Sequence, residues 1–270
     1  MSTAVVVPEA TETREARPVV HRGIPLTRVT AVELRKMFDT RSGFWLMASI
    51  AITAVLATGA TILWAPESEL TYDSFAASIG FPMAVILPMV AILAVTGEWS
   101  QRTGLTTFTL IPHRGRVIGA KAIGAVLIGV VSMLLAFGIG ALGNLAGTAI
   151  TGTDLVWDIS FVHALEIMLA NVLGLMIGFM LGVLIRNSAG AIVAYFVYSL
   201  LLPTLAMLLA TSQQWFRDLQ PWVDFYYAQG ALFNGALTGE QWANLAVAGV
   251  IWLVAPLAVG IALVMRSEVK

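Results

Sequence analysis

Two ionisable residues, His163 and Glu166, lie one helical turn apart in a strongly apolar stretch, and Asn144 lies in the apolar stretch before it. Burying ionisable groups inside a membrane is costly, so such a pair is a candidate for proton transfer. A proton relay would suit an ion- or proton-coupled secondary transporter or a channel. The alternative is a structural pair near the outer end of its helix, where burial costs less, and the position of the pair favours this alternative.

No other arrangement of residues is typical of catalysis or metal binding. The sequence has no cysteine, and its three histidines show no HxxxH or HExxH spacing. It also lacks a GxxxxGK[ST] phosphate-binding loop. No polar segment is long enough for a nucleotide-binding domain, which needs at least about 50 residues. We therefore expect that the chain is not an enzyme and has no catalytic, cofactor-binding or metal-binding residue.

A polar stretch at residues 98–112 separates two apolar stretches and is rich in threonine. Its candidate contact residues, with the first basic residue after it, are Glu98, Trp99, Arg102, Thr103, Thr106, Thr107 and Arg114. The pattern predicts a short helix at the inner membrane surface that offers hydrogen-bonding groups to the cytoplasm. Pro112 ends this helix, because proline has no backbone N–H to donate.

The segment at residues 211–243 is too aromatic for a solvated loop and too polar to cross a membrane. Its most prominent aromatic residues are Trp222, Phe225, Tyr226 and Tyr227. Irregular backbone at membrane depth must be covered by protein. We expect one or two short re-entrant helices that act as a lid or lining at the exit of a pathway, or else as an aromatic anchor at the outer interface.

The elements that must position these residues are membrane helices. With 58% hydrophobic and 11% charged residues, the chain is too apolar for an ordinary soluble domain. A helix needs about 20 mostly apolar residues to cross the hydrocarbon core. Six stretches meet this requirement, at residues 43–64, 78–97, 118–150, 161–185, 189–210 and 244–265. The sequence predicts an all-α membrane protein.

Basic residues lie on one side of this zigzag and acidic residues on the other. Of fifteen Lys and Arg residues, only Arg217 falls in a loop of the acidic side. Basic residues are retained in the cytoplasm during insertion. The asymmetry predicts a multi-pass protein of the cell membrane with both termini in the cytoplasm.

The residues before the first span form two parts. Residues 1–24 have no apolar core, so we expect a mobile cytoplasmic tail and not a signal peptide. Residues 25–42 predict an amphipathic helix in the interface, with Leu26, Val29, Leu34, Met37 and Phe38 on one face. Glu33 breaks this face. The helix would anchor the chain to anionic lipid or contact a partner, and residues 43–266 form the transmembrane domain.

Proline and glycine mark special positions within the spans. Pro88, Pro203 and Pro256 each remove one backbone hydrogen bond and predict kinks, either as hinges for alternating access or as ordinary features of membrane helices. Glycines recur every fourth residue in the fourth span, at Gly174, Gly178 and Gly182. They predict close packing of another helix, most simply within the same subunit.

The polar stretch and its surroundings resemble the permease subunits of the ABC-2 type (type-2 ABC exporter) family, especially its actinobacterial branch. The matching positions are Glu98 at the end of the second span, the threonine-rich segment, Pro112 with Arg114, and Ala120-Lys121 opening the third span. The resemblance extends over residues 25–266. One departure is Arg102-Thr103, where many relatives have Gly-Thr.

This resemblance implies a role that the residues alone do not specify. Such subunits form the membrane pathway of an exporter, pair with separate subunits that bind ATP and Mg²⁺, and work as homodimers or heterodimers. In this interpretation residues 98–112 form the coupling helix that contacts the ATPase. The spans offer few charged groups, which favours an apolar or amphiphilic cargo over an inorganic ion. No nucleic-acid partner is expected.

Overall fold

The computed structural model describes residues 25–39, 41–100 and 114–266 of the 270-residue chain. These residues form helices and connecting segments without a β-strand. Six of the described helices, two of them continuing through a π turn, are long and apolar enough to cross a membrane. The prediction of an all-helical protein with six spans is therefore confirmed.

The amphipathic helix is α1 (Leu26–Asp39), and the first three spans are α2 (Arg41–Trp64), α3 (Tyr72–Ser100) and α5 (Arg114–Thr151). The fourth span is α6 (Phe161–Ile185), with the bounds that hydropathy predicts. The fifth comprises α7 (Ser188–Phe196), the π turn η2 (Val197–Leu201) and α8 (Leu202–Ser212). The sixth comprises α11 (Gly239–Gly249), the π turn η4 (Val250–Val254) and α12 (Ala255–Arg266).

Three short elements lie between the fifth and sixth spans, and one lies between the first and second. The former are α9 (Gln214–Val223), α10 (Phe225–Gly230) and the 3-10 turn η3 (Ala231–Phe233), and the latter is the 3-10 turn η1 (Glu67–Glu69). The expected short helices in the 211–243 segment are thus present as two helices. The structure contains no membrane, so their depth in the bilayer stays a prediction.

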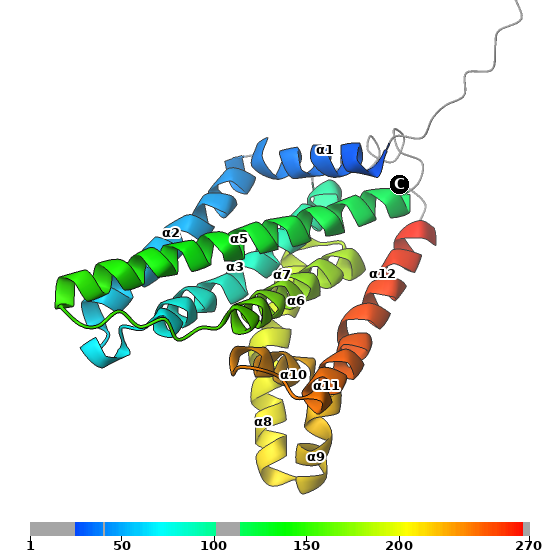
Figure 1. The fold of residues 1–270 in the computed structure, drawn as a ribbon. Helices are drawn as coiled ribbons and strands as arrows, with labels where there is room; N and C mark the ends of the chain where they lie inside the picture. The colour runs from blue at the N-terminus through cyan, green and yellow to red at the C-terminus, as the bar shows by residue number, and fades with distance from the viewer. Residues whose placement is uncertain (1–24, 40, 101–113, 267–270) are drawn as a thin grey trace, which may run out of the picture.

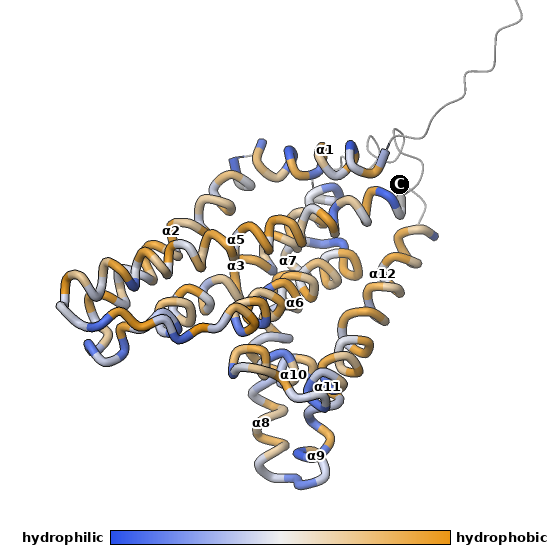
Figure 2. Tube along the Cα trace, viewed as in Figure 1, coloured by the Kyte–Doolittle hydropathy of each residue, from blue (hydrophilic) through white to orange (hydrophobic). Residues whose placement is uncertain are grey.

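The helices α2, α3, α5 and α6 run alongside one another, whereas α8 and α12 diverge from them (Figure 1). In the most apolar window of each span, 50% of the residues of α3 and 56% of those of α6 are buried, against 11% in the fifth span. The core of the chain is therefore the α3–α6 pair. Hydrophobic residues cover the spans along most of their length, and the polar positions gather toward helix ends and connections (Figure 2).

Close contact between α3 and α6 depends on two glycines. A Cβ atom at Gly178 would lie 2.6 Å from the carbonyl oxygen and 2.8 Å from the Cα atom of Pro88. One turn later, a Cβ at Gly182 would lie 3.3 Å from the Cβ of Val95. The glycine pattern of the fourth span therefore serves packing within the subunit, as predicted. Glycine is needed because only a residue without a side chain allows the backbones to approach this closely.

Pro88 leaves the carbonyl of Ala84 without its usual helical donor, four residues later. The hydroxyl of Tyr195, in α7, donates a hydrogen bond to this oxygen at 2.6 Å. The fifth span thus satisfies the backbone group that the proline of the second span exposes. Such compensation is what a membrane helix with an internal proline requires.

The fourth and fifth spans join in a tight hairpin, as the three residues between their predicted ranges, 161–185 and 189–210, indicate. Arg186 follows the last residue of α6 and adopts a left-handed conformation with φ 56°, and its N–H bonds to the carbonyl of Gly182. Asn187 then caps α7, because its side chain accepts a hydrogen bond from the N–H of Gly190 at 2.9 Å. Two residues therefore reverse the chain.

The glycine contact makes a prediction about stability. Gly178→Ala should destabilise the protein by about 1–3 kcal/mol, because the new methyl group would meet backbone atoms that cannot rotate away. Gly138→Ala in α5 is the matched control, since nothing lies within 4 Å of its added Cβ. Thermal unfolding in detergent measures both. Equal melting temperatures for the two variants would contradict the close packing.

Candidate functional site

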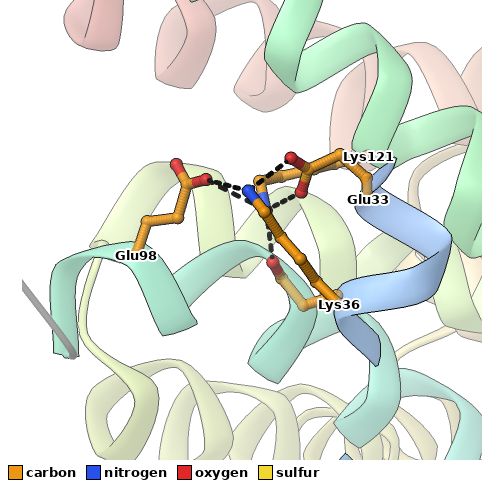
Figure 3. Close-up of polar contacts among 5 residues, drawn as sticks. Glu33, Lys36, Glu98 and Lys121 are labelled. Atoms are coloured by element: carbon orange, nitrogen blue, oxygen red, sulfur yellow. Dashed lines mark hydrogen bonds and ion pairs between the residues drawn. The ribbon is translucent and has the colours of Figure 1, made fainter. Parts of the chain in front are cut away.

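A buried carboxylate, Glu33, projects from the inward face of α1. Its side chain is only 4% exposed, although it interrupts an otherwise apolar face. The ammonium group of Lys36 donates a hydrogen bond to its Oε1 at 2.7 Å, and that of Lys121 donates to its Oε2 at 2.6 Å (Figure 3). Both oxygens are thus paired with positive charge, which is the condition for burying a carboxylate.

Lys121 joins three helices. It projects from α5, is 7% exposed, and donates to Glu33 of α1 and also to the carbonyl oxygen of Ala94 in α3 at 3.0 Å. Its Nζ atom lies 3.5 Å from Oε1 of Glu98, in the last turns of α3. One ammonium group therefore connects α1, α3 and α5.

Glu98 is held by charge more than by hydrogen bonds. It is as buried as Lys121, and its Oε1 lies 3.7 Å from Nζ of Lys36 in addition to the contact with Lys121. That oxygen has no hydrogen-bond partner among the described residues. Glu33, Lys36, Glu98 and Lys121, here named the charge cluster, carry no net charge, and within the cluster Glu98 makes the longest contacts.

The environment of Glu33 determines its ionisation. Burial raises the pKa of this carboxyl, but the adjacent Lys121 and Lys36 outweigh burial and hold the pKa below its ordinary value of 4.5. A lowered pKa means that the folded protein binds the proton less tightly than the unfolded chain. The stabilisation is therefore complete above pH 4.5 and is lost as the pH falls below it.

The sequence-predicted coupling residues are only partly described. The structure places Glu98 in the charge cluster, and Trp99 packs half-buried against the core formed by α3 and its neighbours. Arg114 begins α5, but its side chain is not described. Arg102, Thr103, Thr106 and Thr107, with the proposed coupling helix, lie outside the described residues.

Sequence reasoning missed Glu33, Lys36 and Lys121 as members of one site. Two signals pointed to them: an acid that interrupts the apolar face of α1, and a lysine in a strongly apolar span. Leu26 and Phe38, which were expected on the apolar face, are 38% and 50% exposed. The inward face includes Val29, as expected, together with Thr30 and Glu33.

The outer segment formed by α9, α10 and η3 is anchored by side chains that bond to backbone. The indole N–H of Trp252, in η4, donates to the carbonyl of Val223 at 2.6 Å, where α9 ends. Gln229 of α10 donates from Nε2 to the carbonyl of Ala170 in α6 at 2.7 Å. The segment is therefore folded back onto α6 and the sixth span.

The four aromatic residues of this segment lie in different surroundings. Phe225 is 1% exposed and packs among residues of α6, α7 and α11. Trp222 is half-buried, whereas Tyr226 and Tyr227 are 45% and 53% exposed. Phe225 is thus part of the core, and the two tyrosines are the exposed members of this set.

Arg217, the exceptional basic residue, caps a helix. Its Nε donates to the carbonyl of Ala210 at 2.9 Å and its Nη2 to that of Thr211 at 3.4 Å, at the C-terminal end of α8. A cation there also interacts favourably with the helix dipole. This local role explains why one arginine lies among the acidic loops.

His163 and Glu166 lie close together, as predicted, with 3.6 Å between Nδ1 and Oε2. The other oxygen of Glu166 accepts the backbone N–H of Leu237 at 3.4 Å. Asn144 has a different role. It is fully buried, and its Nδ2 donates a hydrogen bond to the carbonyl of Val156 at 2.8 Å. Glu166 and Asn144 thus each attach an outer connecting segment to a span.

The charge cluster yields a prediction about stability. Glu33→Gln should lower stability by about 3 kcal/mol, because Lys121 would remain buried without its carboxylate partner. This corresponds to a fall of about 6–12 °C in melting temperature. Glu67→Gln is the control, since Glu67 is an exposed acid. Thermal unfolding at neutral pH should separate the two, and a Glu33→Gln variant as stable as the control would contradict the role of the cluster.

Comparison with models of known protein families gives a match over most of the chain. The model of the family described as ABC-2 family transporter protein matches residues 12–269, almost the entire chain. No curated protein matches the sequence significantly. Among the described residues, no group of three or more His, Cys, Asp or Glu side chains could hold a metal ion.

Proposed function

Because the chain belongs to the ABC-2 transporter family, we propose that it is the membrane subunit of an ATP-driven exporter whose charge cluster transmits movement from a separate ATPase. The family consists of multi-pass membrane permeases that lack catalytic activity of their own. ATP and Mg²⁺ bind the partner subunit, and two permease copies, identical or paralogous, complete the transporter. The motif from Glu98 to Lys121 supports a place in the actinobacterial branch.

The observation that carries this proposal is the position of Glu98. It is the first residue of the 98–112 segment that the resemblance assigns to the ATPase contact, and its carboxylate faces two lysines from other helices. A push on that segment therefore acts on α3 directly. It also acts on α1 and α5, because opposite charges in a buried site resist separation strongly.

The weak bonding of Glu98 suits this role. Glu33 accepts short hydrogen bonds from both lysines, while the contacts of Glu98 with the same lysines are longer, at 3.7 and 3.5 Å. A small displacement of α3 would bring Glu98 into hydrogen-bond range of a lysine or remove it from range. The cluster thus supports two arrangements that differ in which acid the lysines bind, as a switching element requires.

The orientation follows from charge. α1, the start of α5 and the end of α12 lie at one end of the molecule (Figure 1). These are the basic parts of the described chain, and basic residues are retained in the cytoplasm. We place this end in the cytoplasm and the 211–243 segment outside.

The cargo is an apolar or amphiphilic molecule, such as a lipid, lipopeptide or antibiotic. Few charged groups lie on the spans, and the charge cluster uses Glu98 and Lys121 internally. His163 and Glu166 were the candidates for a proton-coupled transporter. The bond between Glu166 and Leu237 supports a structural role for this pair instead.

The outer segment forms the lid or lining of the exit. Tyr226 and Tyr227 are its exposed rings, whereas Phe225 fixes it to the core. Aromatic rings between two interrupted spans can close an apolar passage by packing and open it when the helices separate.

The orientation predicts accessibility in intact cells. Cysteine substituted for Glu69 should react with an impermeant thiol reagent, and cysteine substituted for Arg114 should react only after lysis. The native chain supplies no background, because it has no cysteine. Labelling of position 114 in intact cells would overturn the orientation.

The coupling role predicts the behaviour of Glu98→Gln. The purified chain should not hydrolyse ATP, and the tagged chain should co-purify with an ATPase from its native membrane.

Glu98→Gln should change the ATPase rate of this complex about 5-fold or more, the range of a typical coupling free energy. Glu67→Gln should leave the rate unchanged, and an unchanged rate in Glu98→Gln would exclude the cluster from coupling.

The lid predicts a division among its aromatic residues. Tyr226→Ala and Tyr227→Ala should alter the ATPase rate of the complex at normal protein levels, because their rings are exposed. Phe225→Ala should instead lower the stability of the fold by about 3–5 kcal/mol, as for other buried aromatic truncations, and so reduce the amount of folded protein. Unaltered activity in both tyrosine variants would favour the anchor.

A further inference from the structure

The fifth and sixth spans carry the same interruption. Each contains a π turn that ends just before the residue preceding a proline: η2 before Leu202-Pro203 and η4 before Ala255-Pro256. In both, the N–H of the residue before proline bonds to the carbonyl five residues earlier, Val197 in one span and Val250 in the other. The two spans therefore share one local device, with the same offset to proline.

The sequence accounts for this symmetry. Both interruptions follow the pattern Val-x-x-Leu-x-x-Pro, which comprises Val197, Leu200 and Pro203 in one span and Val250, Leu253 and Pro256 in the other. Proline removes one helical hydrogen bond and its ring displaces the carbonyl four residues earlier. A wider turn accommodates that carbonyl. Turns of this kind are rare, are a recognised cause of helix bending, and often mark functional positions.

The two π turns contact each other through aromatic rings. Tyr198 of η2 and Trp252 of η4 have ring centroids 6.0 Å apart, with an interplanar angle of 52°. This lies within the favourable range for aromatic pairs. Bending at one turn therefore displaces a ring that is packed against the other turn.

Both turns also contact the outer segment. Tyr198 packs edge-on against Tyr226 of α10, with centroids 6.3 Å apart. Trp252 donates its indole N–H to the carbonyl of Val223, at the junction of α9 and α10. The same two residues that join the hinges thus connect each of them to the segment between the spans.

Pro88 of α3 provides a contrast. The carbonyl of Ala84, which it leaves without a helical donor, accepts a hydrogen bond from Tyr195, and its own backbone is pressed against Gly178. No π turn accompanies it in α3. Burial follows the same division, with 50% of the apolar window of α3 inside the chain but only 11% and 17% for the fifth and sixth spans. Pro88 therefore lies in the packed core. The π turns before Pro203 and Pro256 lie in spans where few residues of this chain are packed closely enough to resist bending.

We propose that η2 and η4 form a pair of hinges, joined by the Tyr198–Trp252 contact, that bend together and move α9 and α10 with them. The use of this motion in transport deepens the proposed function and rests on it. The hinge pair itself is a property of the single chain and needs no ATPase. Tyr198 acts through its ring, because its hydroxyl has no hydrogen-bond partner among the described residues.

Hydrogen exchange of the purified full-length chain in lipid nanodiscs, resolved by mass spectrometry, tests the proposal without nucleotide. Amides at 197–202 and 250–255 should exchange faster than those at 175–183 in α6. Trp252→Leu should speed exchange about threefold or more at 197–202, in the other span, as expected for neighbours that interact. Tyr198→Leu should have the reciprocal effect at 250–255.

Conservative variants separate the contributions. Tyr198→Phe keeps the ring and should match the native protein. Trp252→Phe keeps the ring contact but loses the donor, so it should speed exchange at 220–226 and leave 197–202 unchanged. Trp242→Leu, on α11, is the control for loss of a half-exposed tryptophan in the same span.

Two results would overturn the proposal. One is exchange at both π turns as slow as in α6, which would exclude hinges. The other is an effect of Trp252→Leu confined to 250–255, which would exclude their coupling. If Trp252→Leu does not fold, the Tyr198→Leu arm decides in the same way. Either negative result leaves the exporter assignment intact, and absence of an ATPase partner leaves the hinge result intact.

Discussion

The ammonium group of Lys121 constrains how the helices α1, α3 and α5 pack against one another. A lysine this deeply buried is tolerated only if its charge and its N–H groups are paired. Glu33 and the carbonyl of Ala94 supply these partners, and Glu98 completes the charge balance. Because each partner comes from α1 or α3, satisfying one side chain sets the positions of two other helices relative to α5. The interfacial helix α1 is therefore an integral part of the bundle.

A second constraint is the obligation to satisfy backbone groups away from water. The chain meets it in two ways at Pro88, Pro203 and Pro256. At Pro88 a tyrosine from another helix bonds to the exposed carbonyl, and the helix stays closely packed. At Pro203 and Pro256 the helix widens into a π turn and keeps its own bonds. The first solution fixes a helix within the core, and the second leaves an interruption that can bend.

In the connections between the spans, side chains rather than regular structure satisfy several of the backbone carbonyls. Asn144 bonds to Val156, in the segment that connects α5 and α6. Gln229 attaches α10 to α6, and Trp252 attaches the end of α9 to the sixth span. These bonds make the outer segment a folded part of the protein with Phe225 at its centre. We propose that these bonds link the movement of this segment to bending of the fifth and sixth spans.

The sequence by itself determined the six spans, the amphipathic helix before them, the tight turn at Arg186 and the short helices of the outer segment. These features depend on local apolar length, periodicity and turn chemistry, which neighbouring residues specify. It also contained two signals that were missed, an acid on the apolar face of α1 and a lysine in the third span. Only the tertiary structure decided which partners they have. Glu33 and Lys121 are 88 residues apart in the sequence, and Tyr195 and Ala84 are 111 apart. Such pairs form only because particular helices pack side by side at a particular rotation, which no local pattern encodes.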